Sequence, residues 1–325
     1  MWPLEKNRET PFVLLFGTGQ IGVFTARALV RRGARVYGAD AAPDGAFYAR
    51  FGPGVDAPEP IKLDVTSGHD VEVFVRSHRD IAAIVFAAGY TSARATAEPV
   101  LARLLAERGV SNVLTAARAS GIRRSVVVSS LAVYGGGTKD NHWAEDGPTQ
   151  PGTVYGQIQL RLEEVARTFS EDIAVGILRV AGVFGPQRFG RGSHSSRFVE
   201  RMLYSAAIGD PIRVEGSWDD EDDLVYVKDV GEAISVAALT PDTGAFTVNV
   251  GMGRVTTLRE IADAVRSVFP TADIVRRPAS GHPEPVRCLP LDSTSLKTRL
   301  GMTPAFSFAS AIHDYAFEVG LIHAN

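Results

Sequence analysis

A glycine-rich turn near the N-terminus sets the strongest limit on how this chain folds. The apolar run Phe12–Phe16 predicts a buried strand, residues 21–32 carry a helical pattern, and Gly17, Gly19 and Gly22 stand between them. In a strand–turn–helix unit with this spacing, the first glycine allows a tight turn, the second lets a pyrophosphate approach the backbone, and the third lets the helix pack on the strand. The free N–H groups at the helix N-terminus then favour an anion. The sequence therefore predicts a dinucleotide-binding unit that opens a parallel sheet.

An acidic residue ends the next predicted strand. That strand is Arg35–Asp40, and Asp40 lies 18 residues after Gly22. A carboxylate there hydrogen-bonds the adenosine ribose hydroxyls of NAD and repels the 2′-phosphate of NADP. Ala41 and Ala42 follow, so no adjacent arginine offers that phosphate a partner. We therefore expect NAD(H) rather than NADP(H). The purely structural alternative is that Asp40 caps a helix or stabilises a turn.

The first half of the chain alternates apolar runs with helical patterns. Continuous apolar runs indicate strands that are covered on both faces. Strands that alternate with helices indicate a parallel sheet. We predict strands at 12–16, 35–40, 61–63, 81–87, 125–129 and 173–178, and helices at 21–32, 100–119 and 155–169. The predicted fold class is therefore α/β, with a doubly wound parallel sheet of the Rossmann type.

The pattern changes after about residue 180, where glycine and proline become frequent and the expected elements shorten. Helical patterns return at 230–238, 258–269 and 308–319, and the charged stretch 219–223 is expected to be a solvated turn. We predict a dinucleotide-binding domain over residues 1–180 and a smaller, interleaved α/β lobe over residues 181–325. Some segments of the second part, at about 225–251, are expected to return to the first.

Composition and charge narrow the function classes. The 325 residues include 45% hydrophobic and 22% charged side chains, which suits a globular chain with a sizeable core. The net charge of −3 gives no electrostatic footprint for nucleic acid or for an anionic membrane. Cys288 is the only cysteine, which excludes an intramolecular disulfide and a multi-cysteine zinc site. We expect a reducing cytoplasm and no metal. No segment has the length and apolarity of a signal peptide or of a membrane helix.

Hydroxyl groups follow the predicted strand 125–129. Ser130 lies at its carboxyl end, the edge where doubly wound sheets bind ligands, and Tyr155 begins a helix 25 residues later. With the glycine turn, these residues occur in the order found in the extended short-chain dehydrogenases/reductases, the NAD-dependent epimerase/dehydratase group. The chain resembles this family over essentially its whole length. The further motifs that carry the resemblance are Asp64–Val65, Ala87–Gly89, Ser129–Gly135, Leu178–Arg179, Gly185–Pro186 and Val225–Val230.

The resemblance implies roles for individual residues. Ser130 takes the position of the catalytic serine, Tyr155 that of the acid/base, and Gln159 that of the lysine in the family motif Tyr-x-x-x-Lys. The cofactor-binding residues implied are Gly17, Gly19, Gln20, Ile21, Gly22, Asp40, Asp64, Val65, Ala87, Ala88, Gly89, Tyr155 and Gln159. The substrate-binding residues implied are Ser130, Leu131, Tyr155, Arg188 and Ser193. Taken singly, each of these residues also has a purely structural alternative: Ser130 could cap a strand end, Asp64 could form a turn, and Tyr155 could be an aromatic residue of the core.

Gln159 is the most informative departure from the family pattern. In the family, a lysine one helical turn after the tyrosine lies on the same face, binds the nicotinamide ribose and lowers the tyrosine pKa. Bringing a pKa near 10 down to 7 takes about 4 kcal/mol, which one cation ~4 Å away supplies at an effective dielectric of ~20. Gln159 has no charge, and Arg161 lies on another side of the helix. Of the five lysines, Lys139 in the preceding loop stays open as a substitute.

These observations leave three functions open. The first is hydride transfer between NAD(H) and a secondary alcohol of a polar small molecule, either sugar-like or a hydroxy acid. The second is nucleotide-sugar epimerisation or dehydration with tightly bound NAD; Gly182 weakens it, because many such enzymes have asparagine there. The third is an NAD-binding regulatory or non-redox protein, which Gln159 favours. The resemblance also implies a homodimer in which helices 100–119 and 155–169 form a four-helix interface.

Overall fold

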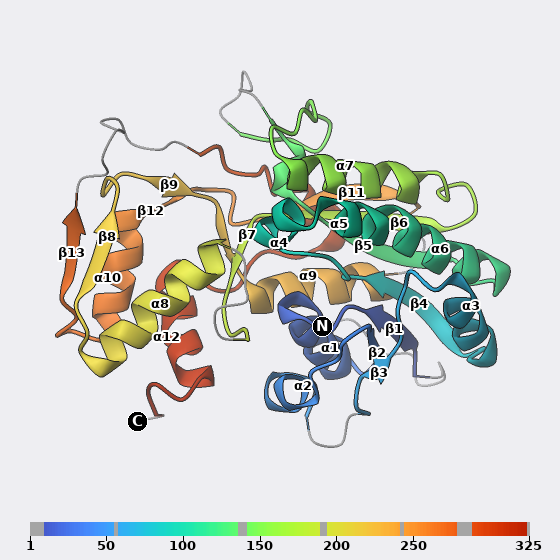
Figure 1. Ribbon diagram of the computed structural model, residues 1–325, viewed down its shortest axis with the longest axis horizontal. Helices are drawn as coiled ribbons and strands as arrows, with labels where there is room; N and C mark the ends of the chain where they lie inside the picture. The colour runs from blue at the N-terminus through green and yellow to red at the C-terminus, as the bar shows by residue number, and fades with distance from the viewer. Residues whose placement is uncertain are drawn as a thin grey trace.

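The computed structural model describes residues 10–54, 58–135, 142–188, 194–240, 244–277 and 288–323, and only the backbone of residues 194 and 195. A larger part surrounds a sheet of seven strands, and a smaller part lies beside it, on the left in Figure 1. The architecture confirms the predicted α/β class. Within the described ranges, no helix has the length and apolar character needed to cross a membrane.

The central sheet is entirely parallel and has the order β11–β6–β5–β4–β1–β2–β3. Its strands are β1 (Phe12–Phe16), β2 (Arg35–Asp40), β3 (Ile61–Lys62), β4 (Ile81–Phe86), β5 (Arg124–Ser130), β6 (Ala174–Val180) and β11 (Phe246–Val250). The strand order reverses between β1 and β4. In a doubly wound sheet, ligands bind at the carboxyl ends of the strands at such a reversal.

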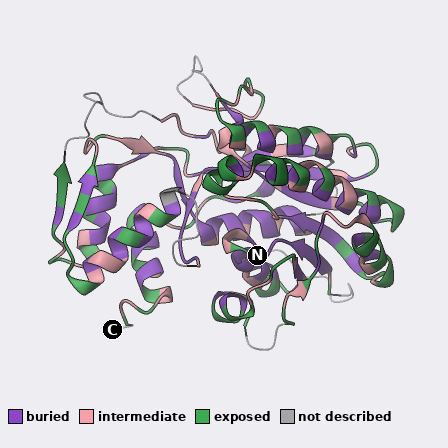
Figure 2. Cartoon of the chain, viewed as in Figure 1, coloured by how far each residue is buried: buried purple, intermediate pink, exposed green. Residues whose placement is uncertain are grey.

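Helices cover both faces of this sheet. All five residues of β1 are buried; Val13 and Leu15 join one core, and Leu14 and Phe16 join the other. The first core includes residues of α1 (Gln20–Arg31), α2 (Gly45–Phe51) and α9 (Val227–Leu239). The second includes residues of α3 (Gly68–Ser77), α4 (Ser92–Ala97), α5 (Pro99–Leu104), η1 (Leu105–Gly109), α6 (Val110–Ala119) and α7 (Val154–Arg167). Figure 2 shows the sheet buried between these two layers.

The predicted helix 100–119 exists, but it has three parts. The α5 and α6 segments are ordinary α-helix, and the five residues of η1 between them form a π-helical turn. The helix predicted at 155–169 is α7, which ends two residues earlier. Residues 99–119 and α7 lie on the same face of the sheet and pack against each other.

The smaller part contains three helices and short two-stranded sheets. Its elements are α8 (His194–Ile208), β8 (Ile212–Glu215), β9 (Glu221–Asp222), β12 (Thr256–Thr257), α10 (Leu258–Val268), β13 (Ile274–Arg277) and α12 (Phe308–Glu318). The strands β7 (Gly182–Phe184) and β10 (Leu224–Tyr226) pair in parallel beyond the end of β6, and α11 (Thr294–Leu300) packs near β11. From this second half, α9 packs on α1 and β11 extends the central sheet.

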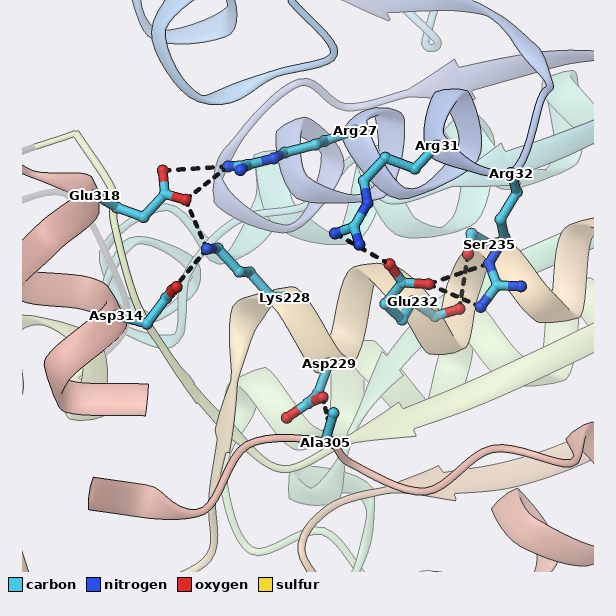
Figure 3. Close-up of polar contacts among 10 residues, drawn as sticks. All are labelled: Arg27, Arg31, Arg32, Lys228, Asp229, Glu232, Ser235, Ala305, Asp314 and Glu318. Carbon is cyan, nitrogen blue, oxygen red and sulfur yellow. Dashed lines mark hydrogen bonds and ion pairs between the residues drawn. The ribbon is translucent and has the colours of Figure 1, made fainter. Parts of the chain in front are cut away.

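Ion pairs connect α12 of the smaller part to α1 and α9 of the larger one (Figure 3). Glu318 on α12 accepts hydrogen bonds from Arg27 at 3.0 Å and from Lys228 at 2.6 Å. Lys228 also lies 2.6 Å from Asp314. Near the same end of α9, Asp229 accepts a 2.7 Å hydrogen bond from the backbone N–H of Ala305. These contacts hold the last helix against the sheet domain.

The structure corrects the interpretation of the charged stretch 219–223 as a solvated turn. Glu221 and Asp222 form β9, and Asp223 is fully buried. One carboxylate oxygen of Asp223 accepts a 2.8 Å hydrogen bond from the backbone N–H of Leu291. Burial raises the pKa of Asp223 to about 7. Asp223 is therefore an interior residue, although the acidic stretch that contains it suggested an exposed turn.

Candidate functional site

The glycine turn after β1 has the shape that a pyrophosphate requires. Gly17 has φ +94°, and an added Cβ there would lie 2.5 Å from the backbone nitrogen of Ala88. An added Cβ on Gly22 would lie 1.8 Å from the carbonyl oxygen of Gly17. Gly19, by contrast, faces open space and begins α1 without a side-chain cap. Two glycines therefore close the turn, and the third leaves room for a ligand at the helix N-terminus.

Asp40 lies at the carboxyl end of β2, beside this turn. One of its oxygens accepts hydrogen bonds from the backbone N–H of Thr18 at 2.8 Å and from its hydroxyl at 3.3 Å. The other accepts a 2.9 Å bond from the backbone N–H of Ala42. These bonds fix the carboxylate next to the glycine turn, and the oxygen that accepts only the Ala42 bond keeps a lone pair for a ribose hydroxyl.

The loop after β3 is held in place at the same edge. Asp64 accepts hydrogen bonds from the backbone N–H of Thr66 at 2.9 Å and from its hydroxyl at 2.8 Å. Asn112 of α6 donates a 2.9 Å bond to the carbonyl of Val65. Val65 is buried, and the other Asp64 oxygen is available for a ligand because the residue is exposed. Asp64 thus offers a polar group to a ligand at this edge, while Val65 packs in the core beneath it.

Ser130 and Tyr155 meet beyond the end of β5. Ser130 caps the short 3₁₀ turn η2 (Leu131–Val133) by accepting a 3.2 Å bond from the backbone N–H of Ala132, and its side chain hydrogen-bonds to that of Tyr155. The next residue, Gly156, makes this approach possible. A Cβ on Gly156 would lie 2.1 Å from the carbonyl oxygen of Ala132, so only glycine lets α7 come this close to η2. A glycine inside a helical pattern was the sequence signal for this contact.

Gln159 lies one helical turn after Tyr155 and is only 8% exposed. Both side chains line a small cavity together with Ala88, Gly89 and Tyr90 from the end of β4. The amide oxygen of Gln159 has no hydrogen-bond partner among the described residues. A buried acceptor without a partner carries a free-energy cost of about 1–3 kcal/mol, which a ligand hydroxyl donated to it would offset. Gln159 therefore fits the ribose of a bound dinucleotide.

Burial raises the pKa of Tyr155 above its ordinary value of 10.0, and the hydrogen bond with Ser130 only partly opposes this. No charged group in the described ranges contributes to the Tyr155 pKa. Lys228 is paired with Asp314 and Glu318 on the helical layer formed by α1 and α9. Lys139 lies outside the described residues. The described part of the site therefore holds Tyr155 as a neutral phenol.

A buried ion pair behind the site escaped the sequence analysis. Glu163, on α7, is fully buried and accepts bonds from Arg179 of β6 at 2.8 and 2.9 Å. The same carboxylate accepts a 2.6 Å bond from the Ser129 hydroxyl and two bonds from Arg167. Arg179 also donates a 2.8 Å bond to the Tyr134 hydroxyl. This cluster joins β5, β6 and α7, the elements that carry or flank Ser130 and Tyr155. Only the motif Leu178–Arg179 pointed to it.

Two side chains connect the cofactor edge to the second half of the chain. Gln20, at the start of α1, donates hydrogen bonds to the carbonyl of Gly185 at 2.9 Å and to the Ser196 hydroxyl at 3.0 Å. Arg188 lies 3.3 Å from the carboxylate of Asp44, just after β2. The structure thus brings Arg188 to the β2 side of the site, three strands away from β5. Ser193, the other expected substrate residue of this segment, lies outside the described residues.

The remaining expected residues lie along the same edge. Ile21 follows Gln20 in the first turn of α1, Ala87–Gly89 follow β4, and Leu131 opens η2 beside Ser130. The carboxyl ends of β1, β2, β3 and β4, with the loops that follow them and the first turn of α1, hold every described residue that we assigned to the cofactor except Tyr155 and Gln159, which belong to α7. The open helix N-terminus, the fixed Asp40 carboxylate and the unpaired Gln159 amide oxygen all fit NAD.

Comparison with known proteins identifies relatives of this chain. The chain is 27% identical over 211 residues to the low-salt glycan biosynthesis protein Agl12 of Haloferax volcanii, an alignment that covers 63% of this chain and 64% of the relative. The chain thus spans less than two thirds of that relative's length.

Solved structures match it at lower identity. The Thermus thermophilus UDP-glucose 4-epimerase, solved with NAD, has a TM-score of 0.75 at 23% identity, with 94% of this chain and 97% of that one covered. A partial consensus L-threonine 3-dehydrogenase has a TM-score of 0.77 at 23% identity, with 94% and 98% covered. The model of the NAD dependent epimerase/dehydratase family matches residues 13–251. The chain belongs to this family, and its cofactor is NAD.

Proposed function

We propose that the protein is an NAD(H)-dependent oxidoreductase that acts on a secondary alcohol, or on the corresponding ketone, of a sugar-like or hydroxy-acid substrate. The observation that carries the proposal is the contact between Ser130 and Tyr155 at the same sheet edge as the glycine turn. Two hydroxyl groups that meet there can hold one substrate oxygen between them. The L-threonine 3-dehydrogenase neighbour shares the fold and agrees with redox chemistry on a small hydroxy compound.

Each residue then has a definite task. The glycine turn and the start of α1, with Gly17, Gly19, Gln20, Ile21 and Gly22, hold the pyrophosphate. Asp40 holds the adenosine ribose, and Asp64 with Val65 holds adenine. Ala87–Gly89 and Gln159 hold the nicotinamide half. When bound, NAD supplies or accepts a hydride.

The substrate oxygen is held by Ser130, while Tyr155 gives it a proton or takes one from it. Leu131 stands beside Ser130 in η2 and contributes an apolar wall to the substrate pocket. Arg188 and Ser193 belong to the segment that follows Gly185–Pro186, and we assign to this segment the polar remainder of the substrate.

A second candidate is epimerisation or dehydration of a nucleotide sugar with tightly bound NAD. The UDP-glucose 4-epimerase neighbour and the family name favour it. The third candidate, an NAD-binding regulator, draws its support from the uncharged Gln159. The hydrogen bond between the Ser130 and Tyr155 side chains argues against it, because a protein that only binds NAD has no need to pair these two hydroxyl groups.

The stoichiometry of the cofactor separates these candidates. Purified protein is mixed with NADH or NAD⁺ and with panels of keto sugars, keto acids, polyols, sugar acids and nucleotide sugars, and the absorbance of NADH is followed. We expect one NADH consumed or formed per substrate converted. Conversion of a nucleotide sugar without net change in NADH would instead support the epimerase or dehydratase, and NAD binding without conversion of any compound would support the regulator.

Asp40 should set the cofactor preference. In wild-type protein NAD(H) is expected to bind more tightly than NADP(H), because the 2′-phosphate would meet the Asp40 carboxylate. In Asp40→Ser the ratio of the Kd for NADP(H) to the Kd for NAD(H) should fall by about tenfold or more, because the serine hydroxyl does not repel the 2′-phosphate. Fluorescence titrations with both cofactors measure this. Equal or tighter binding of NADP(H) by the wild-type protein would overturn the assignment.

We also propose a homodimer in the cytoplasm. Large apolar side chains are exposed on α5 and at the start of α7: Val100 at 78%, Leu101 at 49%, Leu104 at 41% and Val154 at 43%. An apolar patch on two adjacent helices is typical of an interface. Light scattering should give twice the 34.8 kDa of one chain, and Val100→Glu with Leu104→Glu should give a monomer. A monomer at micromolar concentration for the wild-type protein would contradict the proposal.

A further inference from the structure

The helical face that Tyr155 presents to the site is neutral. Gln159 lies next to Tyr155 on this face, is 8% exposed and lines the same cavity. Among the residues that line this cavity, the only other titratable group is the Tyr90 hydroxyl. Gln159 carries no charge, and its buried amide oxygen has no hydrogen-bond partner among the described residues. An uncharged amide, unlike a lysine ammonium, supplies no positive charge to stabilise the phenolate.

The charged groups on the elements packed against α7 are engaged elsewhere. On α4, Arg94 pairs with Glu98 and lies over the ring of Tyr90, 3.8 Å from its centroid. Further pairs join Arg103 and Arg161 to Glu107, Arg161 to Glu164, Arg118 to Asp172, and Arg167 and Arg179 to Glu163. Arg108 on η1 is exposed, and Arg124 on β5 donates a 3.3 Å hydrogen bond to the carbonyl of Ala238. Burial and the hydrogen bond with Ser130 remain the effects on Tyr155, and their sum raises its pKa.

We propose that Gln159 sets the direction of the reaction: the site is built to reduce a ketone with NADH, because Tyr155 is held as a proton donor. This inference rests on the proposed oxidoreductase function. An enzyme leaves the equilibrium of its reaction unchanged, but each direction starts from one protonation state. Reduction starts from the phenol and oxidation from the phenolate. With a pKa above 10, fewer than about one molecule in a thousand carries the phenolate at pH 7.

The reductive step balances with the groups named. The carbonyl carbon gains a C–H bond from a hydride, which brings both electrons from the reduced nicotinamide. The carbonyl oxygen gains the Tyr155 proton as its C=O π bond breaks. The ketone becomes the alcohol, NADH is oxidised to NAD⁺, and the Tyr155 phenolate takes a proton from water.

Ionisation of Tyr155 can be measured without any substrate. Phenolate absorbs near 295 nm, so the pH-dependent spectrum of the protein minus that of Tyr155→Phe isolates this residue from the other tyrosines. The titration is run with and without NAD⁺ on three backgrounds: wild type, Gln159→Lys and Gln159→Met. Methionine is the matched control, because it has a similar length to lysine and no charge. Circular dichroism at each pH verifies that the protein stays folded.

We expect no Tyr155 signal below pH 10 in wild type or in Gln159→Met. In Gln159→Lys the signal should appear up to about 3 pH units lower, a thousandfold rise in phenolate at neutral pH. A wild-type Tyr155 that ionises below pH 8 would overturn the proposal even if Gln159→Lys failed to fold. So would equal titrations of Gln159→Lys and Gln159→Met in folded proteins.

The rates provide the second readout. On a substrate pair that the wild-type protein accepts, with substrate and cofactor saturating in each direction, the ratio of the kcat of ketone reduction to the kcat of alcohol oxidation at pH 7 should fall at least tenfold in Gln159→Lys and stay unchanged in Gln159→Met. An unchanged ratio in Gln159→Lys, with its Tyr155 signal shifted, would refute the link between ionisation and direction. A third outcome is that the Tyr155 absorbance titrates as expected but the protein reduces no ketone. That result would refute the oxidoreductase function and leave the ionisation of Tyr155 established.

Discussion

Replacing Tyr155 with phenylalanine is expected to lower kcat by about 10²–10⁴-fold and to leave NAD binding intact. The range is the usual contribution of one positioned proton donor. The substitution removes only the hydroxyl that meets Ser130, while the ring keeps its place between η2 and the cavity beside Gln159. Steady-state rates on one accepted substrate, together with NAD titration by fluorescence, measure both quantities.

Tyr37→Phe is the matched control for this experiment. Tyr37 belongs to β2 and packs against Phe12, with ring centroids 4.0 Å apart. Because we assign Tyr37 no part in the reaction, the loss of its hydroxyl should leave kcat unchanged. A near-normal rate in Tyr155→Phe would mean that another group moves the proton. The assignment of Ser130 and Tyr155 would then fail together with the proposed reaction.

Replacing Arg179 with methionine is expected to destabilise the fold strongly. The change leaves the fully buried Glu163 carboxylate with the Ser129 hydroxyl and with Arg167, whose side chain is 42% exposed. Removing one partner of a buried ion pair costs about 3–5 kcal/mol, because the other charge stays buried. For a chain of this size, that corresponds to a fall in Tm of about 5–10 °C. Thermal unfolding followed by circular dichroism measures it.

An exposed arginine on α7, the helix that carries Glu163, supplies the comparison. Arg161 pairs with Glu107 and Glu164 and is 49% exposed, so Arg161→Met should change stability by at most about 1 kcal/mol. Similar small shifts for Arg161→Met and Arg179→Met would show that the buried cluster contributes little to stability. Because the cluster joins α7 to β5 and β6, Arg179→Met should also weaken the contact between Ser130 and Tyr155.

The strands and the cofactor edge could be predicted because their signals are local. A buried parallel strand such as β1 is a continuous apolar run, and the glycine turn places its three glycines within six residues. The structure gives β1 the bounds expected from the apolar run and puts Asp40 at the end of β2. The helix at 100–119 could also be predicted, but its π-helical turn η1 could not, because helix propensity does not distinguish a π-helical turn from an α-helical one.

The second half of the chain was harder, because its elements are short. The strands of β9 and β12 have two residues each, and α8 begins next to residues whose sequence is polar and glycine-rich. The burial of Asp223 shows the same difficulty. Its neighbours in sequence are charged, whereas its partner Leu291 is distant in the chain. Short segments carry too few residues for a hydrophobic period to stand out.

By itself, the sequence determined the βαβ order, the glycine turn, the acidic residue at the end of β2 and the absence of a lysine one turn after Tyr155. Each of these is written in residues that lie close together. Only the tertiary structure decided that Gly156 lets α7 reach Ser130, that Arg179 and Glu163 pair behind the site, and that Arg188 reaches Asp44. The physical reason is the same for all three. Each contact joins segments that are separate along the chain, and its formation depends on how the sheet and helices pack around it.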